Sequence, residues 1–458
     1  MAEMPEPADE VDVVVVGLGV GGEEVAGRLA AAGRSVVGIE HRLVGGECPY
    51  WGCVPSKMMI RAANLLAEAR RIPGMAGQSS VEPDWSPVAK RIREEATDDW
   101  DDQVAVDRFT GKGGRFVRGY ARITGPGTVE VDDRVFRARQ AIVIGTGTAP
   151  AVPPIDGLAG TPYWTNREAI EVEELPDSLI VLGGGAIGLE LAQVFARFGV
   201  RVSVVESLDR LLAVEEPESS ALADTALRAD GIAVRTGARA SRVGYDGQQF
   251  TVTIEGGAEL VAQRLLVATG RRASLADLGL SSVGLDERAR FVEVDERLRA
   301  GEGLWAVGDV TGRGAFTHVA MYQADIIVRD ILGQGGPAAD YRALPRVTFT
   351  DPEIGAVGLT EAQAREQGIR VATAYTDLTA ATRGWIHKVG NEGFIKLVAD
   401  ADRDVLVGAT AAGPSGGEVL GALTVAVHAE VPIGTLRSMI YAYPTFHRAI
   451  EAALKELK

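Results

Sequence analysis

The sequence contains two cysteines, Cys48 and Cys53, which lie five positions apart in the stretch GGECPYWGCVPSK. Cysteines at such a spacing serve as a structural disulfide, as part of a metal site, or as a redox-active pair. No second cysteine pair or nearby cluster of ligands accompanies them, which argues against a metal site. An inert buried pair stays open at this point, since free cysteines often act as small hydrophobic residues. The sequence favours redox chemistry over these alternatives.

A disulfide between these residues requires an irregular backbone. In a regular helix, two Cα atoms five positions apart exceed the limit of roughly 7 Å for a disulfide. We expect the irregularity at the Cys48 end, supplied by Pro49 together with Gly45 and Gly46.

The cysteines follow a glycine-rich motif in the segment VDVVVVGLGVGGEEVAGRLAAAGRSVVGIE. A β-branched run precedes Gly17, Gly19 and Gly22, an Ala/Leu-rich helix follows, and a second apolar strand ends at Glu40, 23 positions after Gly17. This order predicts a βαβ unit carrying the G-x-G-x-x-G dinucleotide fingerprint.

A second copy occurs in SLIVLGGGAIGLELAQVFARFGVRVSVVE. It contains Gly183, Gly185 and Gly188, and its closing strand ends at Glu206, again 23 positions after the first glycine. In each copy the first glycine makes the tight turn, the second admits the pyrophosphate, and the third allows the helix to pack on the strand. Two copies predict two dinucleotides held on separate domains.

A further pair of similar sequence segments occurs, one after each fingerprint. The apolar strand in AIVIGTGTAP ends before Gly147, and the apolar strand in LLVATGRRAS ends before Gly270. This similarity suggests a duplicated architecture. GLWAVGDVTG then ends another strand at Gly308 and Asp309. From about Tyr341 the pattern changes to alternating strands, turns and helices, which predicts a separate α+β region.

Composition and charge limit the classes of binding partner that we expect. The 458 residues are 46% hydrophobic and carry a formal net charge of -16, which predicts a globular protein that binds neither nucleic acid nor anionic membranes. The acidic start MAEMPEPADE lacks a signal peptide's features, and the first apolar run is too short to span a bilayer. We therefore expect a cytoplasmic protein, where a purely structural disulfide would be unusual.

These motifs, in this order, resemble the pyridine nucleotide-disulfide oxidoreductases, which include dihydrolipoamide dehydrogenase, glutathione reductase and mercuric reductase. The cysteine motif is the most specific part of the resemblance, which extends over essentially the whole chain. It implies an α/β enzyme with two Rossmann-like domains and a C-terminal α+β domain that forms a homodimer interface. The implied segments are 1–149 (FAD-binding, first part), 150–272 (NAD(P)-binding), 273–340 (FAD-binding, return segment) and 341–458 (dimerisation).

The resemblance also implies roles for single residues. Cys48 matches the interchange thiol that attacks the substrate, and Cys53 matches the charge-transfer thiol next to the flavin. Lys57 matches the lysine beside the flavin ring, with Glu190 as its expected partner. Asp309 would bind the ribityl chain of FAD, and Glu40 would bind its adenosine ribose.

Glu206 bears on the choice of nicotinamide cofactor. A carboxylate at this position hydrogen-bonds a ribose 2′-hydroxyl and repels a 2′-phosphate. No basic residue follows before Arg210. We expect NADH to be preferred over NADPH.

The chain departs from the family in its last helix. In YAYPTFHRAIEAAL, Tyr443 stands where the disulfide-reducing members have the histidine of their acid/base dyad, and Arg448 stands where they have the glutamate. Tyr443 could donate a proton weakly, or His447 and Glu451, one helical turn apart, could form a displaced dyad.

We expect an enzyme that passes electrons from NADH through FAD to a Cys48–Cys53 disulfide and on to a disulfide or dithiol substrate, as in dihydrolipoamide dehydrogenase. Because the usual dyad is missing, a quinone, a metal ion or a nicotinamide remains open as a small-molecule acceptor reduced directly from flavin. A sensor that binds FAD and NAD without turnover is the alternative of another class, and no resident metal is expected.

Overall fold

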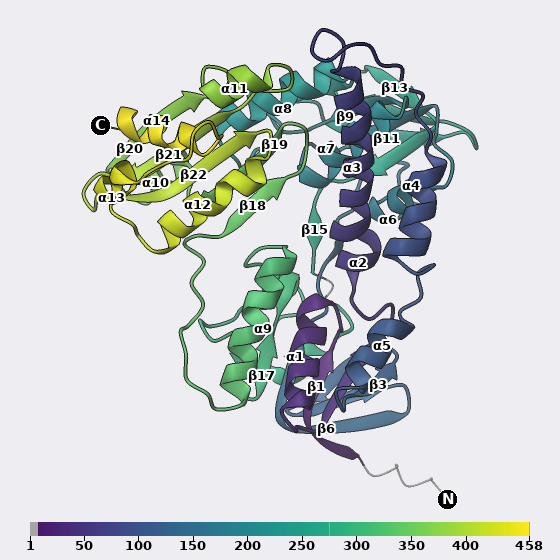
Figure 1. Ribbon diagram of the computed structural model, residues 1–458. Coiled ribbons are helices and arrows are strands. Elements are labelled where there is room, and N and C mark those ends of the chain that lie inside the picture. Colours follow the sequence, from purple (N-terminus) through teal and green to yellow (C-terminus); the bar gives the residue numbers. More distant parts are fainter. Residues whose placement is uncertain (1–7, 274, 458) are drawn as a thin grey trace, which may run out of the picture. The chain divides into compact units, whose positions relative to one another are not determined.

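A computed structural model describes residues 8–273 and 275–457 of the chain (Figure 1). The contacts within the chain group into two compact units of three segments each. The first unit holds residues up to Pro55, Lys90–Ala151 and Arg271–Asp340, and the second holds Ser56–Ala89, Val152–Gly270 and the chain from Tyr341 onward. Most of the acidic N-terminal stretch lies outside the described residues. The four-segment division expected from the sequence stays a prediction.

The first unit is built on a largely parallel sheet with the strand order β16-β17-β6-β1-β2-β3. Its strands are β1 (Asp9–Val16), β2 (Val36–Glu40), β3 (Arg115–Arg118), β4 (Ala121–Gly125), β5 (Thr128–Val131), β6 (Arg134–Ile144), β16 (Arg299–Gly301) and β17 (Leu304–Ala306), and a separate pair is formed by β7 (Ala149–Pro150) and β15 (Arg271–Arg272). Strand β1 lies between β2 and β6, and its last four valines are almost fully buried. This central position explains the continuous β-branched run in the sequence.

The helices of this unit connect and cover the sheet. They are α1 (Val20–Ala31), α2 (Glu47–Trp51), α5 (Gln103–Thr110) and α9 (Thr317–Ile331), with shorter or irregular turns at η1 (Ile92–Ala96), η2 (Leu280–Val283) and η3 (Gly308–Thr311). Helices α1 and α9 lie side by side (Figure 1). Their apolar faces join the core formed with β1, β2 and β6. Two further helices, α3 (Cys53–Arg70) and α4 (Ser86–Arg91), cross from one unit to the other.

The second unit begins with a parallel sheet in the order β10-β9-β8-β14. The elements of this part are α6 (Asn166–Glu171), β8 (Ser178–Leu182), α7 (Ala186–Arg197), β9 (Arg201–Val205), α8 (Pro217–Ala229), β10 (Ala233–Arg235), β11 (Ala240–Tyr245), β12 (Phe250–Ile254), β13 (Glu259–Ala262) and β14 (Arg264–Val267). Strands β8 and β9 pair in parallel and are joined by α7, which is the second predicted βαβ unit. Strands β11, β12 and β13 form a small antiparallel sheet.

The rest of the second unit is an antiparallel sheet covered by helices, with the strand order β18-β19-β22-β21-β20. Its elements are β18 (Pro345–Thr348), β19 (Glu353–Gly358), α10 (Glu361–Glu366), β20 (Val371–Asp377), α11 (Thr382–His387), β21 (Phe394–Asp400), β22 (Val405–Gly413), α12 (Gly416–His428), α13 (Ile433–Ser438) and α14 (Arg448–Glu456). Helix α12 packs on β19 and β22, and α14 packs on β20 and β21. The predicted mixed α/β fold with a C-terminal α+β region is therefore confirmed.

The backbone between the cysteines corrects one expectation. Cys48 lies in the short helix α2, and Pro49 is inside that helix rather than at an irregular point. A proline fits there because backbone N–H groups in the first helical turn have no intrahelical acceptor. The interruption falls at Gly52, whose φ of -127° and ψ of -120° end α2 just before α3 begins at Cys53. Gly45 and Gly46 adopt positive φ but precede both cysteines.

Candidate functional site

The two cysteines lie together in the first unit. Cys48 is half-buried in α2, and Cys53 is exposed at the first residue of α3; no disulfide joins the two. The two thiols are hydrogen-bonded to each other. The break at Gly52 therefore brings together two side chains that a continuous helix would hold apart.

The surroundings of Cys48 favour its protonated thiol. The hydrogen bond between Cys48 and Cys53 and, after it, burial raise the pKa of the Cys48 thiol far above its ordinary value. A buried thiol resists ionisation because its charged form is poorly solvated. In the reduced pair the Cys48 thiol therefore keeps its proton more readily than an exposed thiol would.

The glycines of the first fingerprint take distinct positions. Gly17 has a φ of +90°, and a Cβ there would lie 2.6 Å from the carbonyl oxygen of Gly145. A Cβ on Gly22 would lie 2.0 Å from the carbonyl oxygen of Gly17. Gly19, by contrast, has no neighbour closer than 4.0 Å at that point. Two of the three glycines are thus required by the fold, and Gly19 faces space that a phosphate could approach.

The second fingerprint repeats this arrangement in the second unit. Gly183 has a φ of +112°, and its Cβ would lie 2.3 Å from the carbonyl oxygen of Ala268. A Cβ on Gly188 would lie 2.4 Å from the carbonyl oxygen of Gly183, whereas one on Gly185 would meet nothing within 4 Å. The open second glycine precedes helix α7, whose first N–H groups are suited to an anion.

Glu40 accepts backbone hydrogen bonds at the end of β2. The Leu18 N–H donates to its Oε2 at 2.9 Å, and the Arg42 N–H donates to its Oε1 at 2.8 Å. Burial raises the pKa of this carboxyl, but hydrogen bonds from His41, Arg42 and Leu18 together bring the pKa below its ordinary value. The side chain is therefore an ionised acceptor beside the first fingerprint.

Glu206 is held in the same way at the end of β9. The Gly184 N–H donates to its Oε2 at 2.6 Å, and the Leu208 N–H donates to its Oε1 at 2.7 Å. Arg210, the first basic residue that follows, is engaged elsewhere: its guanidinium donates to the carbonyl oxygen of Ala213 at 2.7 Å and to the Ser220 hydroxyl at 2.6 Å.

Asp309 ends a chain of polar contacts inside the first unit. The Thr148 hydroxyl donates to Asp309 Oδ2 at 2.9 Å, and the Nε of Arg271 donates to the Thr148 oxygen at 2.8 Å. Burial raises the pKa of the Asp309 carboxyl above its ordinary value. The preceding residue, Gly308, donates its N–H to the buried Gln323 side chain at 2.7 Å.

The residues present fit the two dinucleotides that the motifs predict. The backbone is open at Gly19 and Gly185, as described above. A Cβ on Gly147 or Gly270 would likewise meet nothing within 4 Å, so both nucleotide folds are open at corresponding points. In the first unit the buried Thr146 hydroxyl has no hydrogen-bond partner. Open glycine backbone and an unsatisfied buried hydroxyl are features that a bound cofactor would complete.

Lys57 and Glu190 form an ion pair in the second unit. Lys57 Nζ lies 2.7 Å from Glu190 Oε2, and the other carboxylate oxygen accepts the Phe349 N–H at 2.8 Å. The Lys57 ammonium also lies 4.6 Å from the centre of the Phe349 ring. Glu190 is only 6% exposed, so its charge is buried and paired, not on an exposed helix face. Lys57 follows Cys53 by one turn of α3.

Tyr443 contacts Arg448, the residue that replaces the glutamate of the dyad. The Arg448 guanidinium lies 5.8 Å from the centre of the Tyr443 ring, and the Tyr443 side chain is 66% exposed. Glu451 bonds to Arg448 and to Lys455, each at 2.8 Å. Among the residues described around α14, no bond joins His447 to Glu451. The structure thus brings Tyr443 and Arg448 together and directs Glu451 to two cations.

Sequence reasoning missed Thr317, the first residue of α9. Its hydroxyl oxygen lies 3.5 Å from Cys53 Sγ and is also hydrogen-bonded to Cys48. The residue falls in the stretch FTHVAM. A threonine at a helix start is common, so no pattern in the sequence separates it from a residue that only begins a helix.

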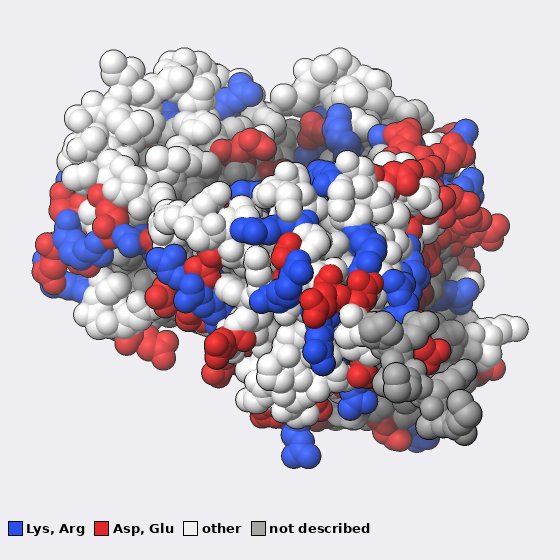
Figure 2. All heavy atoms as spheres, turned by 90° about the horizontal axis from the view of Figure 1, so that it is seen from below, with Lys and Arg blue, Asp and Glu red and all other residues white. Residues whose placement is uncertain are grey.

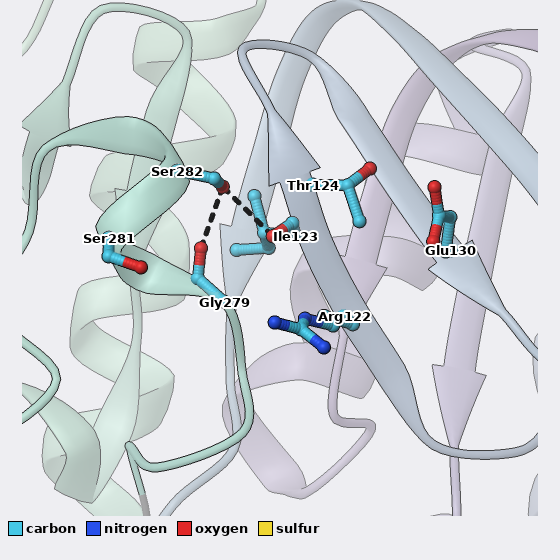
Figure 3. Close-up of a pocket in the computed structure, with 7 residues that line it drawn as sticks. All are labelled: Arg122, Ile123, Thr124, Glu130, Gly279, Ser281 and Ser282. Carbon is cyan, nitrogen blue, oxygen red and sulfur yellow. Dashed lines mark hydrogen bonds between the residues drawn. The ribbon is translucent and has the colours of Figure 1, made fainter.

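A hollow of about 280 Å³ lies in the first unit (Figure 3). It is lined by Arg122, Glu130, Gly279, Ser281 and Ser282, among others. The Ser282 hydroxyl already donates to the Gly279 carbonyl oxygen at 2.7 Å. None of the predicted site residues lines this hollow, and we assign it no role.

The face drawn in Figure 2 shows basic and acidic side chains interspersed rather than gathered into one basic surface. Within residues 8–273 and 275–457, no helix is long and apolar enough to cross a membrane. The same residues include no group of three or more His, Cys, Asp or Glu side chains arranged to hold a metal ion.

Two family models match the chain. Residues 11–324 match the pyridine nucleotide-disulphide oxidoreductase model, and residues 344–454 match the dimerisation domain of the same family. The chain belongs to the pyridine nucleotide-disulfide oxidoreductase family. This pyridine nucleotide-disulfide oxidoreductase is therefore an enzyme of a family that binds FAD and NAD(P), and the recognition made from the motifs is confirmed.

Curated relatives of this oxidoreductase have more than one activity. It is 34% identical to a dihydrolipoyl dehydrogenase of Thermus scotoductus, with 97% of each chain covered. It is 35% identical to a mercuric reductase of Streptomyces lividans, with 96% of this chain and 95% of the relative covered. The relatives agree on the family but differ in the electron acceptor that their names imply.

Solved structures of the family share the fold of this oxidoreductase. The HOCl-induced flavoprotein disulfide reductase RclA from Escherichia coli superimposes with a TM-score of 0.85 at 27% identity, covering 98% of this oxidoreductase and 100% of RclA. LpdA from Mycobacterium tuberculosis superimposes with a TM-score of 0.85 at 25% identity, covering 98% and 99% of the two chains. The oxidoreductase is thus a flavoprotein disulfide reductase by family.

Proposed function

We propose that this enzyme uses NADH to reduce a Cys48–Cys53 disulfide, and that the resulting dithiol reduces a disulfide substrate. The contact between the two thiols carries the proposal, because it lies in the unit whose open glycines fit FAD. Bound FAD would supply two-electron transfer between NADH and the disulfide. Residues that would hold FAD are Gly17, Gly19, Gly22, Glu40, Gly147, Gly308 and Asp309.

The cysteines divide the chemistry between them. Cys48 attacks one sulfur of the substrate disulfide, which forms a mixed disulfide and releases the first substrate thiol. Cys53 then attacks Cys48, releases the second thiol and restores the Cys48–Cys53 disulfide. The balanced reaction is NADH + H⁺ + RSSR → NAD⁺ + 2 RSH.

NADH is the proposed donor because of Glu206. Its carboxylate is held by two backbone N–H groups, where it can accept from a ribose 2′-hydroxyl and would repel a 2′-phosphate. Arg210 donates to carbonyl oxygens and to Ser220 and so would have to be released before it could bind such a phosphate. Gly183, Gly185, Gly188 and Gly270 would complete the NADH site.

The enzyme is proposed to act as a homodimer. The dimerisation domain exposes large apolar side chains that an isolated domain would leave in water, including Trp385 at 71%, Val425 at 65% and Ile440 at 99%. Such exposure is typical of surfaces that a second copy covers. Tyr443 lies in the same domain and would serve the acceptor in place of the family's histidine, as a weaker proton donor.

An acceptor panel tests the proposal. Purified holoenzyme is mixed with NADH and with lipoamide, glutathione disulfide, a quinone or a nicotinamide analogue, and the oxidation of NADH is followed. Disulfide reduction in the wild type that disappears in Cys48→Ser supports the proposed route. If quinone turnover in Cys48→Ser equals that of the wild type and no disulfide is reduced by either protein, the electrons leave directly from flavin and the proposed route is wrong.

Reduction of a thiophilic metal ion is a second candidate. Several relatives are named mercuric reductases, and structures of RclA include a Cu(II) complex. A soft metal ion can displace the proton of a thiol by binding the sulfur, so the raised pKa of Cys48 would hinder it less than it hinders attack on a disulfide. Anaerobic NADH oxidation by Hg(II) or Cu(II), with loss in Cys48→Ser, would identify this activity. A rate with metal no higher than without it would exclude this candidate.

A further inference from the structure

The loop that follows Glu206 is bonded to the second nucleotide fingerprint. This cofactor loop, residues 207–216, connects β9 to α8. The Gly184 N–H donates to Glu206 Oε2 at 2.6 Å, and the Gly184 carbonyl oxygen accepts the Leu212 N–H at 2.9 Å. Gly184 is thus bonded both to the carboxylate and to the middle of the cofactor loop, so the position of the loop is linked to that of the fingerprint.

The far end of the cofactor loop is bonded to the dimerisation domain. Arg346 of β18 donates to both carboxylate oxygens of Glu215, from Nε and from Nη2, each at 2.9 Å. Glu215 is only 7% exposed, and its N–H donates to the Leu212 carbonyl oxygen at 2.8 Å. A bidentate pair of this kind fixes both the distance and the orientation of the carboxylate. The position of Leu212 is therefore set from the dimerisation domain as well as from the fingerprint.

A second ion pair holds the residue next to Glu215. Glu216, which is 3% exposed, accepts from Lys396 Nζ at 3.0 Å and from the Glu361 N–H at 2.7 Å. Lys396 lies on β21, and Glu361 begins α10. Glu216 directly precedes α8. Loss of the Arg346–Glu215 pair would thus leave the start of α8 attached and would loosen only the cofactor loop before it.

Arg210 is held by the part of the cofactor loop that the Arg346–Glu215 pair fixes. Its guanidinium donates to the carbonyl oxygens of Leu212 and Ala213, at 3.3 Å and 2.7 Å. A guanidinium is well suited to bind phosphate oxygens, but these N–H groups are already used. As long as the two carbonyl groups keep their positions, the Arg210 side chain is kept away from a phosphate.

We propose that Arg346 and Glu215 are positioning residues that determine the choice of nicotinamide cofactor. By fixing the cofactor loop, the pair keeps Arg210 bonded to the loop's own carbonyl oxygens and leaves the Glu206 carboxylate to meet the adenosine ribose. Without the pair, the loop can move, and Arg210 can turn to a 2′-phosphate. The dimerisation domain therefore supports the selection of NADH over NADPH. The proposal rests on the proposed preference for NADH.

The test measures cofactor binding without turnover. Oxidised, FAD-loaded enzyme is titrated by calorimetry with NAD⁺ and, separately, with NADP⁺, and the ratio of the two dissociation constants is compared among variants. Glu215→Gln removes the carboxylate charge, and Arg346→Met removes the guanidinium. Because Arg346→Met leaves a buried carboxylate without its cation and could fail to fold, the double variant Arg346→Met/Glu215→Gln is also measured.

We expect NADP⁺ binding, relative to NAD⁺ binding, to strengthen about tenfold in Glu215→Gln and in the double variant, as for a gained hydrogen bond between charged groups. Arg346→Lys keeps the charge but loses the bidentate geometry, so its change should be smaller. Adding Arg210→Met to Glu215→Gln should abolish the gain, because the released guanidinium is the group that binds the 2′-phosphate. A role in stability alone would not make the gain depend on Arg210.

Arg370→Met is the matched control. Arg370 pairs with Asp402 in the same domain, but these side chains are 64% and 67% exposed, and the ratio should equal that of the wild type. If the wild type prefers NAD⁺ and the ratio is unchanged in folded Glu215→Gln and in the double variant, this proposal alone is overturned. A gain that persists after Arg210→Met overturns it as well. A wild type that binds NADP⁺ more tightly would instead overturn the proposed preference for NADH, and this proposal with it.

Discussion

Glu206 holds the same place in the second nucleotide fold that Glu40 holds in the first. Each carboxylate accepts one N–H from the residue after the first fingerprint glycine and one from the residue two positions beyond itself. The equal 23-residue spacing in the sequence thus corresponds to an equal hydrogen-bond pattern in three dimensions. The duplication extends from the order of motifs down to single atoms.

Glu206→Gln should reduce the preference for NADH. The amide keeps an oxygen that can accept the Gly184 N–H. It lacks the negative charge that repels a 2′-phosphate, and it accepts a weaker hydrogen bond from the ribose 2′-hydroxyl than a carboxylate does. We expect kcat/KM for NADH to fall about tenfold and that for NADPH to rise, measured by steady-state kinetics. Glu259→Gln, an exposed position on β13, is a suitable control. If the wild-type enzyme prefers NADPH, the inference of NADH preference from Glu206 is wrong.

Lys57→Met should destabilise the enzyme through Glu190. The buried carboxylate would lose its cation and keep only the Phe349 N–H. Because Lys57 is 35% exposed, water screens part of the pair, and we expect a loss of about 1–3 kcal/mol in the free energy of unfolding by urea.

The double variant Lys57→Met/Glu190→Gln separates pairing from packing. Removing both charges should recover part of the stability lost in Lys57→Met, since no buried carboxylate is left without its partner. If the loss of stability in the double variant equals the sum of the losses in Lys57→Met and in Glu190→Gln, the two side chains are not energetically coupled. Reduction of the flavin by NADH, followed at 450 nm by stopped flow, should be slower in both proteins if Lys57 acts beside the ring.

Sequence patterns predicted the fold well because its signals are local. The strand, glycine turn and helix that surround Gly17 and Gly183 occupy about thirty consecutive residues, and each glycine is required by a close backbone approach. The break between the cysteines was misplaced for the same reason: Pro49 is the usual helix breaker, yet in the first turn it is tolerated, and Gly52 interrupts the chain.

Contacts between distant segments were harder to predict. The pairing of Lys57 with Glu190, 133 positions apart, was expected from the family resemblance and not from spacing. Thr317 was missed because its contact with Cys53 depends on how α9 packs beside α1, which no local pattern encodes. The contact between Arg448 and Tyr443 joins two departures from the family that look unrelated in the sequence.

Protonation of Glu40 should reduce stability in acid. Its pKa is lowered in the folded protein, so its ionised form favours folding above the unfolded value, about 4.3, and this contribution disappears as pH falls through the lower folded pKa. We expect the melting temperature of Glu40→Gln to lie below that of the wild type at pH 7 and the gap to close below about pH 4. A gap that is independent of pH would mean that shape, not charge, accounts for the effect.

Restoring the family's dyad should speed reduction of a disulfide. Tyr443→His alone places an imidazole beside the Arg448 guanidinium, which disfavours its protonated form. Adding Arg448→Glu replaces that cation by a carboxylate that favours it. We expect lipoamide reduction to rise modestly in the single variant and by about 10²-fold in Tyr443→His/Arg448→Glu, the lower range for a positioned acid/base. Arg448→Glu alone is the control, and a double variant no faster than the wild type would show that proton transfer does not limit this chemistry.

The two glycines Gly185 and Gly188 should respond differently to the same substitution. A Cβ on Gly185 meets nothing within 4 Å, and its φ of -85° is open to any residue, so Gly185→Val should leave the melting temperature nearly unchanged. The added side chain would fill the space that a pyrophosphate needs, and NADH binding should weaken at least tenfold. Gly188→Val should instead lower the melting temperature, because its Cβ would lie 2.4 Å from the Gly183 carbonyl oxygen. Calorimetry and NADH titration of both variants distinguish a cofactor contact from a packing contact, and a Gly185→Val enzyme that binds NADH normally would remove this glycine from the site.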